Sequence, residues 1–197
     1  MKEFVYKALL AGKRRYNVGI IDYVLMSNHI HFIAIIDDLT QFENFMRTTN
    51  SAIAKEINRV HEKRSSAIED RYKSPVIEDE AYLLNTINYI WQNPLRAGMV
   101  GGRNLGDYEF SSLFRRLRGL NDPLCDSYDM LKGYFGSITD GTRSEQDFAR
   151  RLLDAGMKDR EDLLPEIYEH LHSVGTDDYR KIRRKRENIS FFQLQPP

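Results

Sequence analysis

The sequence predicts an α+β fold, in which helices cover one face of an antiparallel sheet. Two neighbouring stretches, "YNVGIIDYVLM" and "HIHFIAII", are rich in β-branched and aromatic residues, and Ser27-Asn28 forms a plausible turn between them. Segments with helical spacing of apolar residues precede and follow this hairpin. A hairpin followed by a helix, a short strand and a second helix is typical of a sheet with one helical layer.

The first helix is expected over residues 2–15, before the hairpin. After the hairpin, Thr40 and Glu43 form a capping box, and apolar residues recur at three- and four-residue steps as far as Val60. The polar, basic stretch that follows has the composition of a loop. These patterns predict a long helix that begins near Thr40.

A short strand is expected at 74–79, followed by a helix over "EAYLLNTINYIWQN". Pro94 should end or kink this helix, because proline lacks the N–H that a helix interior needs. Further along, "SEQDFARRLLDAG" predicts a helix with Ser144 as its cap and Gly156 as its stop.

The character of the chain changes after roughly residue 115, and six basic residues occur within positions 180 to 186. We therefore expect two parts, a catalytic domain over 1–118 and a helical C-terminal extension with a basic tail over 119–197.

Composition narrows the class of protein. The 197 residues include 29 basic and 29 acidic side chains, so overall charge gives no general attraction to nucleic acid. The single Cys125 excludes an internal disulfide. The sequence shows neither a signal peptide nor an apolar run of about 20 residues that would span a bilayer. We expect a cytoplasmic protein with no membrane contact.

Two histidines lie inside the most apolar stretch of the chain. Side chains alternate along a strand, so His29 and His31 face the same side, about 7 Å apart. Such a pair is able to converge on one cation, although a pair of packed core residues would produce the same pattern.

The predicted helix after residue 80 carries a polar stripe beside its apolar one. Asn85, Tyr89 and Asn93 lie at successive four-residue steps, with Arg96 beyond them if the helix continues past Pro94. A tyrosine at such a position is either an amphipathic packing residue or a nucleophile. A nucleophilic phenol needs help in losing its proton, since free tyrosine has a pKa near 10.

The stretches "YVLMSNHIHF" and "YIWQNPLRAGMV" resemble the two signature segments of the single-tyrosine HUH (IS200-like) transposases, and they are most similar to the REP-associated group. The segments "DRYKSPVIEDEAYLL" and "YEFSSLFRRLRG" are similar to the family's intervening and following segments. The resemblance covers roughly residues 5 to 118.

The resemblance implies a metal-dependent reaction on single-stranded or hairpin DNA. His29 and His31 would be metal ligands, with Asn93 as a third ligand and Gln92 as a less favoured one. Tyr89 would attack the scissile phosphate to give a 5′-phosphotyrosine and a free 3′-hydroxyl. The metal would be Mg²⁺ or Mn²⁺, and imidazole ligands suit Mn²⁺ better. The protein would be associated with the nucleoid, and a homodimer remains open.

The chain departs from the family at its start. Relatives usually have a first strand, central in a ferredoxin-like sheet, ahead of the first helix, and here this strand is expected to be absent. Its loss would leave backbone groups unpaired on a buried strand. Three explanations are a different start of the chain, a strand supplied by a partner or a second copy, and a decayed remnant.

Basic side chains near the signature segments are the candidate DNA contacts: Arg71, Lys73, Arg96, Arg115 and Arg116. Each of them is also compatible with an ordinary solvated surface.

Two other functions remain open: a domesticated protein that binds DNA hairpins without cutting them, and a phosphodiesterase in which water attacks and Tyr89 only packs. The only acidic residues evident near the histidines are Asp37 and Asp38, at the far end of the strand.

Overall fold

The structure is a computed structural model that describes residues 1–62, 76–77, 80–101, 105–126, 140–156 and 189–194. Its centre is a three-stranded antiparallel sheet in the order β1 (Gly19–Leu25), β2 (Ile30–Ile35) and β3 (Ile189–Leu194). The predicted α+β class with an antiparallel sheet is confirmed.

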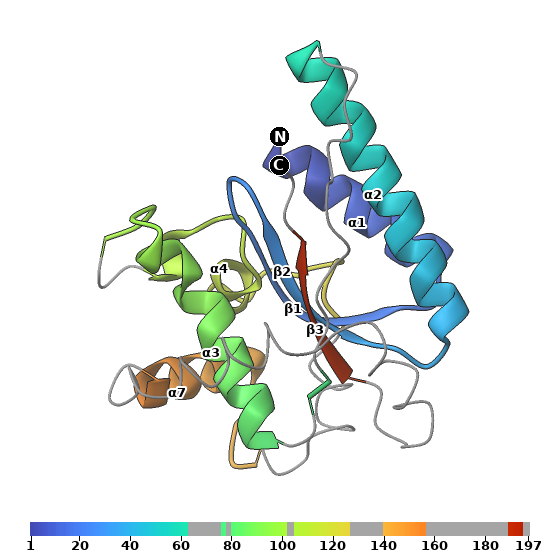
Figure 1. The fold of residues 1–197 in the computed structure, drawn as a ribbon. Coiled ribbons are helices and arrows are strands. Elements are labelled where there is room, and N and C mark those ends of the chain that lie inside the picture. Colours follow the sequence, from blue (N-terminus) through green and yellow to red (C-terminus); the bar gives the residue numbers. More distant parts are fainter. Residues whose placement is uncertain (63–75, 78–79, 102–104, 127–139, 157–188, 195–197) are drawn as a thin grey trace.

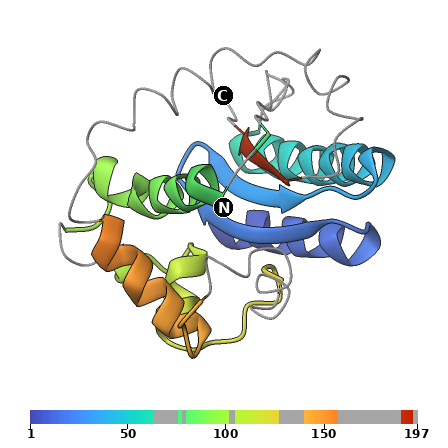
Figure 2. The same ribbon diagram turned by 90° about the horizontal axis from the view of Figure 1, so that it is seen from below.

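Helices lie on both faces of this sheet (Figures 1 and 2). One layer consists of α1 (Lys2–Arg15) and α2 (Leu39–His61), so the prediction that the helices cover a single face is wrong in this respect. A second group packs on the opposite face and contains α3 (Glu80–Arg96), the short 3-10 helix η1 (Leu105–Asp107), α4 (Ser112–Leu117) and α7 (Glu145–Gly156). The alternation of side chains along β2 supplies apolar groups to both faces, which explains why this strand is apolar throughout.

Two hydrophobic cores result, one on each face of the sheet. On the first face Phe32 packs with Phe42 and Phe45 of α2. On the second face Ile33 lies in a cluster with Ile87 and Trp91 of α3. These side chains are buried, and their burial is the main force that holds the two helical groups on the sheet.

Helix α2 begins two residues earlier than the capping box predicted. Asp38 is the residue before the helix, and its carboxylate accepts hydrogen bonds from the backbone N–H groups of Thr40 and Gln41. A carboxylate at this position satisfies donors that the first turn leaves without partners. The predicted cap at Thr40 is therefore wrong by two positions.

The helix α3 continues to Arg96, with Pro94 inside its last turn. Pro94 therefore neither ends the helix at residue 93 nor prevents Arg96 from following it. The predicted helix after Ser144 is confirmed, and the Ser144 hydroxyl accepts a hydrogen bond from the backbone N–H of Asp147. Of the strand expected at 74–79, only Val76 and Ile77 are described. The basic run at 180–186 lies outside the described residues.

The edge of β2 that lacked a predicted neighbour is paired with β3, from the far end of the chain. The register runs from Ile30 opposite Leu194 to Ile35 opposite Ile189. Figure 1 shows β3 beside β2, with β1 on the other side of β2. The strand that carries His31 is therefore central, and its third-strand partner comes from the same chain rather than from a second copy. The division at residue 118 remains a prediction.

No helix among the described residues is long and apolar enough to cross a membrane.

Candidate active site

The β1–β2 hairpin places the two histidines on the face covered by α3. His29 precedes β2 at the hairpin turn, and His31 is the second residue of β2. Their rings are adjacent, with centroids 4.6 Å apart and nearly perpendicular planes. His31 is fully buried, whereas His29 is half-buried. The same-side placement that the strand pattern predicts is therefore present.

Burial keeps both imidazoles neutral. It lowers the pKa of His29, and burial together with the neighbouring His29 lowers the pKa of His31 well below its usual range. Neutral imidazole is the form that binds a metal ion. The Nδ1 atom of His29 lies 2.8 Å from Oδ1 of Asn28. When Nδ1–H donates to this amide oxygen, the lone pair is on Nε2, as in a histidine ligand held by an outer partner.

Helix α3 brings Tyr89 against this pair. The ring of Tyr89 packs edge-on against His31, with centroids 5.6 Å apart. The guanidinium of Arg96 lies over the same tyrosine ring, 5.1 Å from its centroid. Tyr89 is only 3% exposed, so its ring belongs to the packed interface between α3 and the sheet.

Asn93 lies one turn after Tyr89 on the same helix. Its Nδ2 donates a hydrogen bond to the carbonyl oxygen of Tyr89 at 2.8 Å, and the residue is 8% exposed. This bond uses the nitrogen of the amide, so the amide oxygen is the end that remains suitable as a ligand. Gln92, the less favoured alternative, accepts a hydrogen bond from Arg96 at 3.1 Å.

These residues fit a divalent cation in part. The described residues contain no group of three or more His, Cys, Asp or Glu side chains that would hold a metal. His29 and His31 supply two neutral imidazoles, and a third protein ligand would have to be an amide such as that of Asn93. A set of two nitrogens and one amide oxygen suits Mn²⁺ better than Mg²⁺.

A buried polar network behind the site was not predicted. The indole Nε1–H of Trp91 lies 3.1 Å from each carboxylate oxygen of Asp22, and the Ser112 hydroxyl donates to Oδ1. Burial raises the pKa of Asp22 to about 6, while Arg116, Ser112 and Trp91 act to lower it. Asp22 is therefore ionised at neutral pH although it is only 1% exposed.

Asp22 reaches α3 because of an irregularity in β1. The register with β2 shifts between Ile20 and Asp22, so Ile21 is an extra residue on this strand. Both Ile21 and Asp22 consequently face α3, where Ile21 joins the core around Trp91. The sequence does hold a signal for this contact, since Asp22 is the only charged residue within "GIIDYVL".

The predicted DNA contacts have different environments. Arg116 is 3% exposed and lies between Asp22, at 3.7 Å, and Glu145 of α7, at 2.9 Å. Its guanidinium is therefore held in the interior and not on a surface that DNA reaches. Arg115 is partly exposed and pairs with Asp122 at 3.6 Å. Arg96 is exposed beside Tyr89. Arg71 and Lys73 lie outside the described residues.

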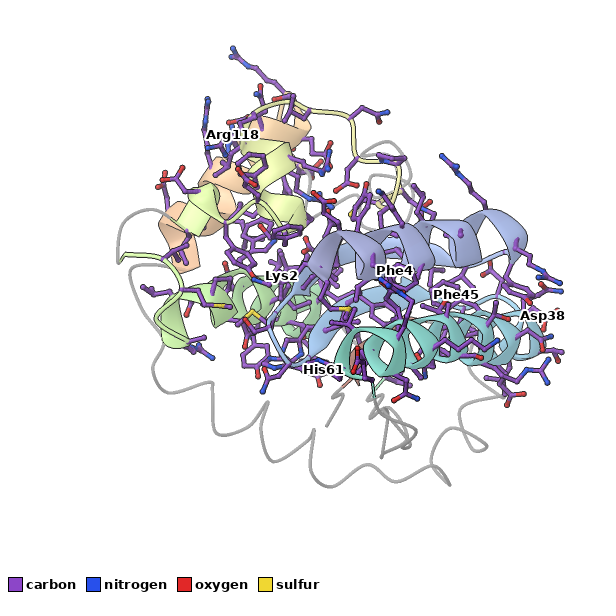
Figure 3. The ribbon with its side chains drawn as sticks, turned by 90° about the horizontal axis from the view of Figure 1, so that it is seen from above. Lys2, Phe4, Asp38, Phe45, His61 and Arg118 are labelled. Carbon is purple, nitrogen blue, oxygen red and sulfur yellow. The ribbon has the colours of Figure 1, made fainter. Side chains whose placement is uncertain are left out.

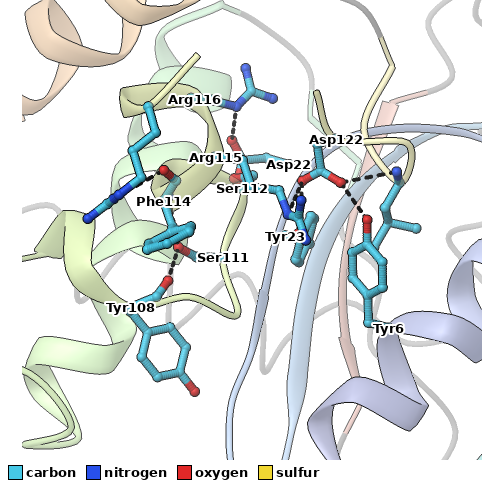
Figure 4. A network of polar contacts seen from close by, with 12 residues as sticks. Tyr6, Asp22, Tyr23, Tyr108, Ser111, Ser112, Phe114, Arg115, Arg116 and Asp122 are labelled. Carbon is cyan, nitrogen blue, oxygen red and sulfur yellow. Dashed lines mark hydrogen bonds and ion pairs between the residues drawn. The ribbon is translucent and has the colours of Figure 1, made fainter. Parts of the chain in front are cut away.

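A second network joins α1 to the segment after α4. The hydroxyls of Tyr6 and Tyr23 donate to the two carboxylate oxygens of Asp122, at 2.9 and 2.8 Å (Figure 4). Lys13 forms an ion pair with Asp126 at 2.7 Å. Residues as far as Asp126 thus contact the first helix and the first strand.

The site lies within a region that matches a known family. Residues 1–93 match the family model described as transposase IS200-like. The match covers just under half of the chain and includes His29, His31, Tyr89 and Asn93. It supports the IS200-like family, and it does not distinguish the REP-associated group from other members. No curated protein and no solved structure matches the chain.

Proposed function

We propose that the protein is a transposase that nicks and rejoins single-stranded DNA at hairpin-forming repeats, with Tyr89 as its nucleophile. The observation that carries this proposal is the placement of His29, His31 and Tyr89 side by side between β2 and α3. The match of residues 1–93 to IS200-like transposases adds support, because it includes all of these residues.

His29, His31 and Asn93 would hold the divalent metal in this proposal. A bound metal would act as a Lewis acid that withdraws charge from the scissile phosphate. The neutral state of both imidazoles favours this role, because protonated histidine has no lone pair to offer. Asn28 would orient His29 through the contact at Nδ1.

Tyr89 would attack the phosphorus atom of one phosphodiester. The new bond joins the phenolic oxygen to phosphorus, the bond from phosphorus to the 3′ oxygen breaks, and the phenolic proton leaves to a base or to water. The products are a 5′-phosphotyrosine and a free 3′-hydroxyl. Attack by another 3′-hydroxyl reverses the step and joins strands, so no ATP is consumed.

Arg96 would act on both the Tyr89 phenol and the DNA strand in this step. Its positive charge lies over the ring of Tyr89, where it stabilises negative charge that develops on the phenol. The guanidinium is also exposed and is able to contact a phosphate of the bound strand.

The second candidate is a DNA-hairpin-binding protein that does not cut. The burial of Tyr89, at 3% exposure, favours this alternative, because a nucleophile has to reach its phosphate. The transposase proposal therefore requires α3 to move relative to β2 when DNA binds.

A covalent-adduct assay separates the two functions. The full chain is incubated with a single-stranded hairpin oligonucleotide and Mn²⁺ or Mg²⁺, and protein–DNA adducts are resolved on a denaturing gel. Wild type should form an adduct, Tyr89→Phe should form none while it still binds, and the control Tyr82→Phe on the same helix should retain the adduct. Binding without an adduct in wild type would favour the second candidate, and an adduct in Tyr89→Phe would exclude this nucleophile.

A further inference from the structure

A pocket of about 260 Å³ lies at the closed end of the β1–β2 hairpin, between the start of α1 and the end of α2. Figure 3 shows Lys2 and His61 at this end of the two helices, which run in opposite directions. Apolar side chains from three elements line the pocket: Val5, Leu25, Ile53 and Ile57. His31, Asn93 and Tyr89 of the site proposed above do not line this cavity.

Five further lining residues are polar or basic. Ser27, Asn28 and His29 come from the hairpin turn, while Lys2 and His61 come from the helix ends. Among the described residues that line the pocket, none is acidic. The lining thus combines apolar side chains with hydrogen-bonding groups and positive charge, which is complementary to an anionic ligand with an apolar face.

His29 lines the pocket and also belongs to the candidate metal site. A phosphate bound at His29 and His31 therefore has the pocket beside it. The group that can enter is the base of a neighbouring nucleotide in the same strand. The Nδ1 contact of His29 involves Oδ1 of Asn28, so the amide nitrogen of Asn28 is the end suited to reading a base edge.

We propose that this pocket binds one unpaired base of the DNA strand, from a nucleotide adjacent to the scissile phosphate. This inference rests on the proposed function and adds a base-binding subsite to it. The volume lies just below the range of about 300–1,000 Å³ that is usual for small-molecule sites, which suits a single planar group and excludes a duplex. An unpaired base brings the apolar face and the polar edge that the lining matches.

The Lys2 side chain supports a nucleotide rather than a neutral ligand. Its ammonium group lies 5.0 Å from the ring centroid of Tyr108 and 5.4 Å from that of Phe110. Lys2 lines the pocket but these two rings do not, so the contacts keep its positive charge next to the pocket, where a phosphate beside the inserted base would pass.

The test combines a change in the DNA with a change in the pocket. Binding is measured by fluorescence anisotropy with full-length Tyr89→Phe protein, so that cleavage does not interfere. The probes are a hairpin oligonucleotide with a single-stranded flank and matched probes that carry an abasic site at each flanking nucleotide in turn. The pocket variant adds Ile57→Trp to fill the cavity, and the control adds Leu120→Trp at an exposed position that does not line the pocket.

One abasic position should weaken binding to the Tyr89→Phe protein without a pocket substitution (the unfilled protein) about 5- to 150-fold, the range expected for loss of one bound base. Ile57→Trp should bind the intact probe correspondingly weakly and show no further loss with that abasic probe, whereas Leu120→Trp should behave like the unfilled protein. Equal abasic losses in all proteins, or no loss at any position, would overturn the pocket assignment. The DNA-side result holds even if Ile57→Trp fails to fold.

The outcomes also separate this inference from the function it rests on. An adduct on Tyr89 in wild type without any abasic effect would overturn only the pocket. An abasic effect that Ile57→Trp abolishes, together with no adduct in wild type, would retain the pocket and favour binding without cutting. No binding of the intact probe would overturn both.

Discussion

Replacing Arg116 by methionine is expected to destabilise the protein by an amount that grows with pH. The guanidinium is 3% exposed, and its partner Asp22 is 1% exposed, with Nε and Oδ2 3.7 Å apart. Methionine keeps most of the apolar volume but leaves the carboxylate of Asp22 buried without a countercharge. Removing one partner of a buried ion pair costs about 3–5 kcal/mol.

The pH dependence follows from the pKa of Asp22. Burial raises this pKa from 3.8 to about 6, so the folded protein binds a proton at Asp22 more tightly than the unfolded chain does. The stability contributed by this proton is fully present below the unfolded pKa, and about 3 kcal/mol is lost as pH rises through about 6. Without Arg116 the pKa rises further and the loss becomes larger. The two proteins should therefore differ least in acid and most above neutral pH.

The assay is urea unfolding of wild type and variant at about pH 5 and about pH 8. Arg116 also pairs with Glu145, so the comparison is repeated with Glu145→Gln in both proteins to remove the contribution of that carboxylate. Burial holds the pKa of the Cys125 thiol well above its usual range, so the thiol stays protonated in this pH interval. When Arg116→Met is measured in an Asp22→Asn background, its cost in unfolding free energy should depend little on pH, because no carboxylate is left to ionise at position 22. A cost below about 1 kcal/mol at both pH values, or one that grows in acid, would show that Arg116 does not stabilise the ionised carboxylate of Asp22.

Three further predictions concern the metal, the sheet and a helix cap. Asn28→Ala should weaken Mn²⁺ binding, measured by calorimetry, by about 10- to 100-fold, because His29 loses its orienting partner; unchanged affinity would contradict this role. Of Phe191→Pro and Phe192→Pro, tested separately, one should lower the urea midpoint at a cost of about 1–3 kcal/mol, because the N–H groups of neighbouring strand residues point to opposite edges and one of them faces β2; an unchanged midpoint for both would contradict the β2–β3 pairing. Asp38→Ala should cost about 0.5–2 kcal/mol in the same assay and Thr40→Ala much less, whereas the reverse order would restore Thr40 as the cap of α2.

The elements set by local patterns were predictable from the sequence. Hairpin, helices and the Ser144 cap depend on residues within a few positions of one another, so periodicity and capping preferences locate them. The same periodicity placed His29 beside His31 and put Asn93 one turn after Tyr89. The contact between His31 and Tyr89 also requires α3 to pack on the face of β2 that carries the histidines, and the local sequence pattern does not specify this packing.

The features that sequence reasoning missed join distant segments. Strand β3 pairs with β2 across more than half of the chain, and nothing within "ISFFQL" specifies its partner. Asp22 was missed because its partners Trp91 and Arg116 come from other elements, although a carboxylate within an apolar strand does indicate a buried contact. Arg116 resembled a surface cation for the same reason, since its burial depends on α7.

The proposed function requires Tyr89 to form a covalent bond with DNA. The most direct measurement is mass spectrometry of wild-type protein after reaction with a hairpin oligonucleotide and Mn²⁺, followed by nuclease and protease digestion. We expect a nucleotide attached through phosphate to the peptide that contains Tyr89, with the fragment ions placing the mass on this residue. A nucleotide on any other residue, or cleaved DNA without a modified peptide, would show that Tyr89 is not the nucleophile.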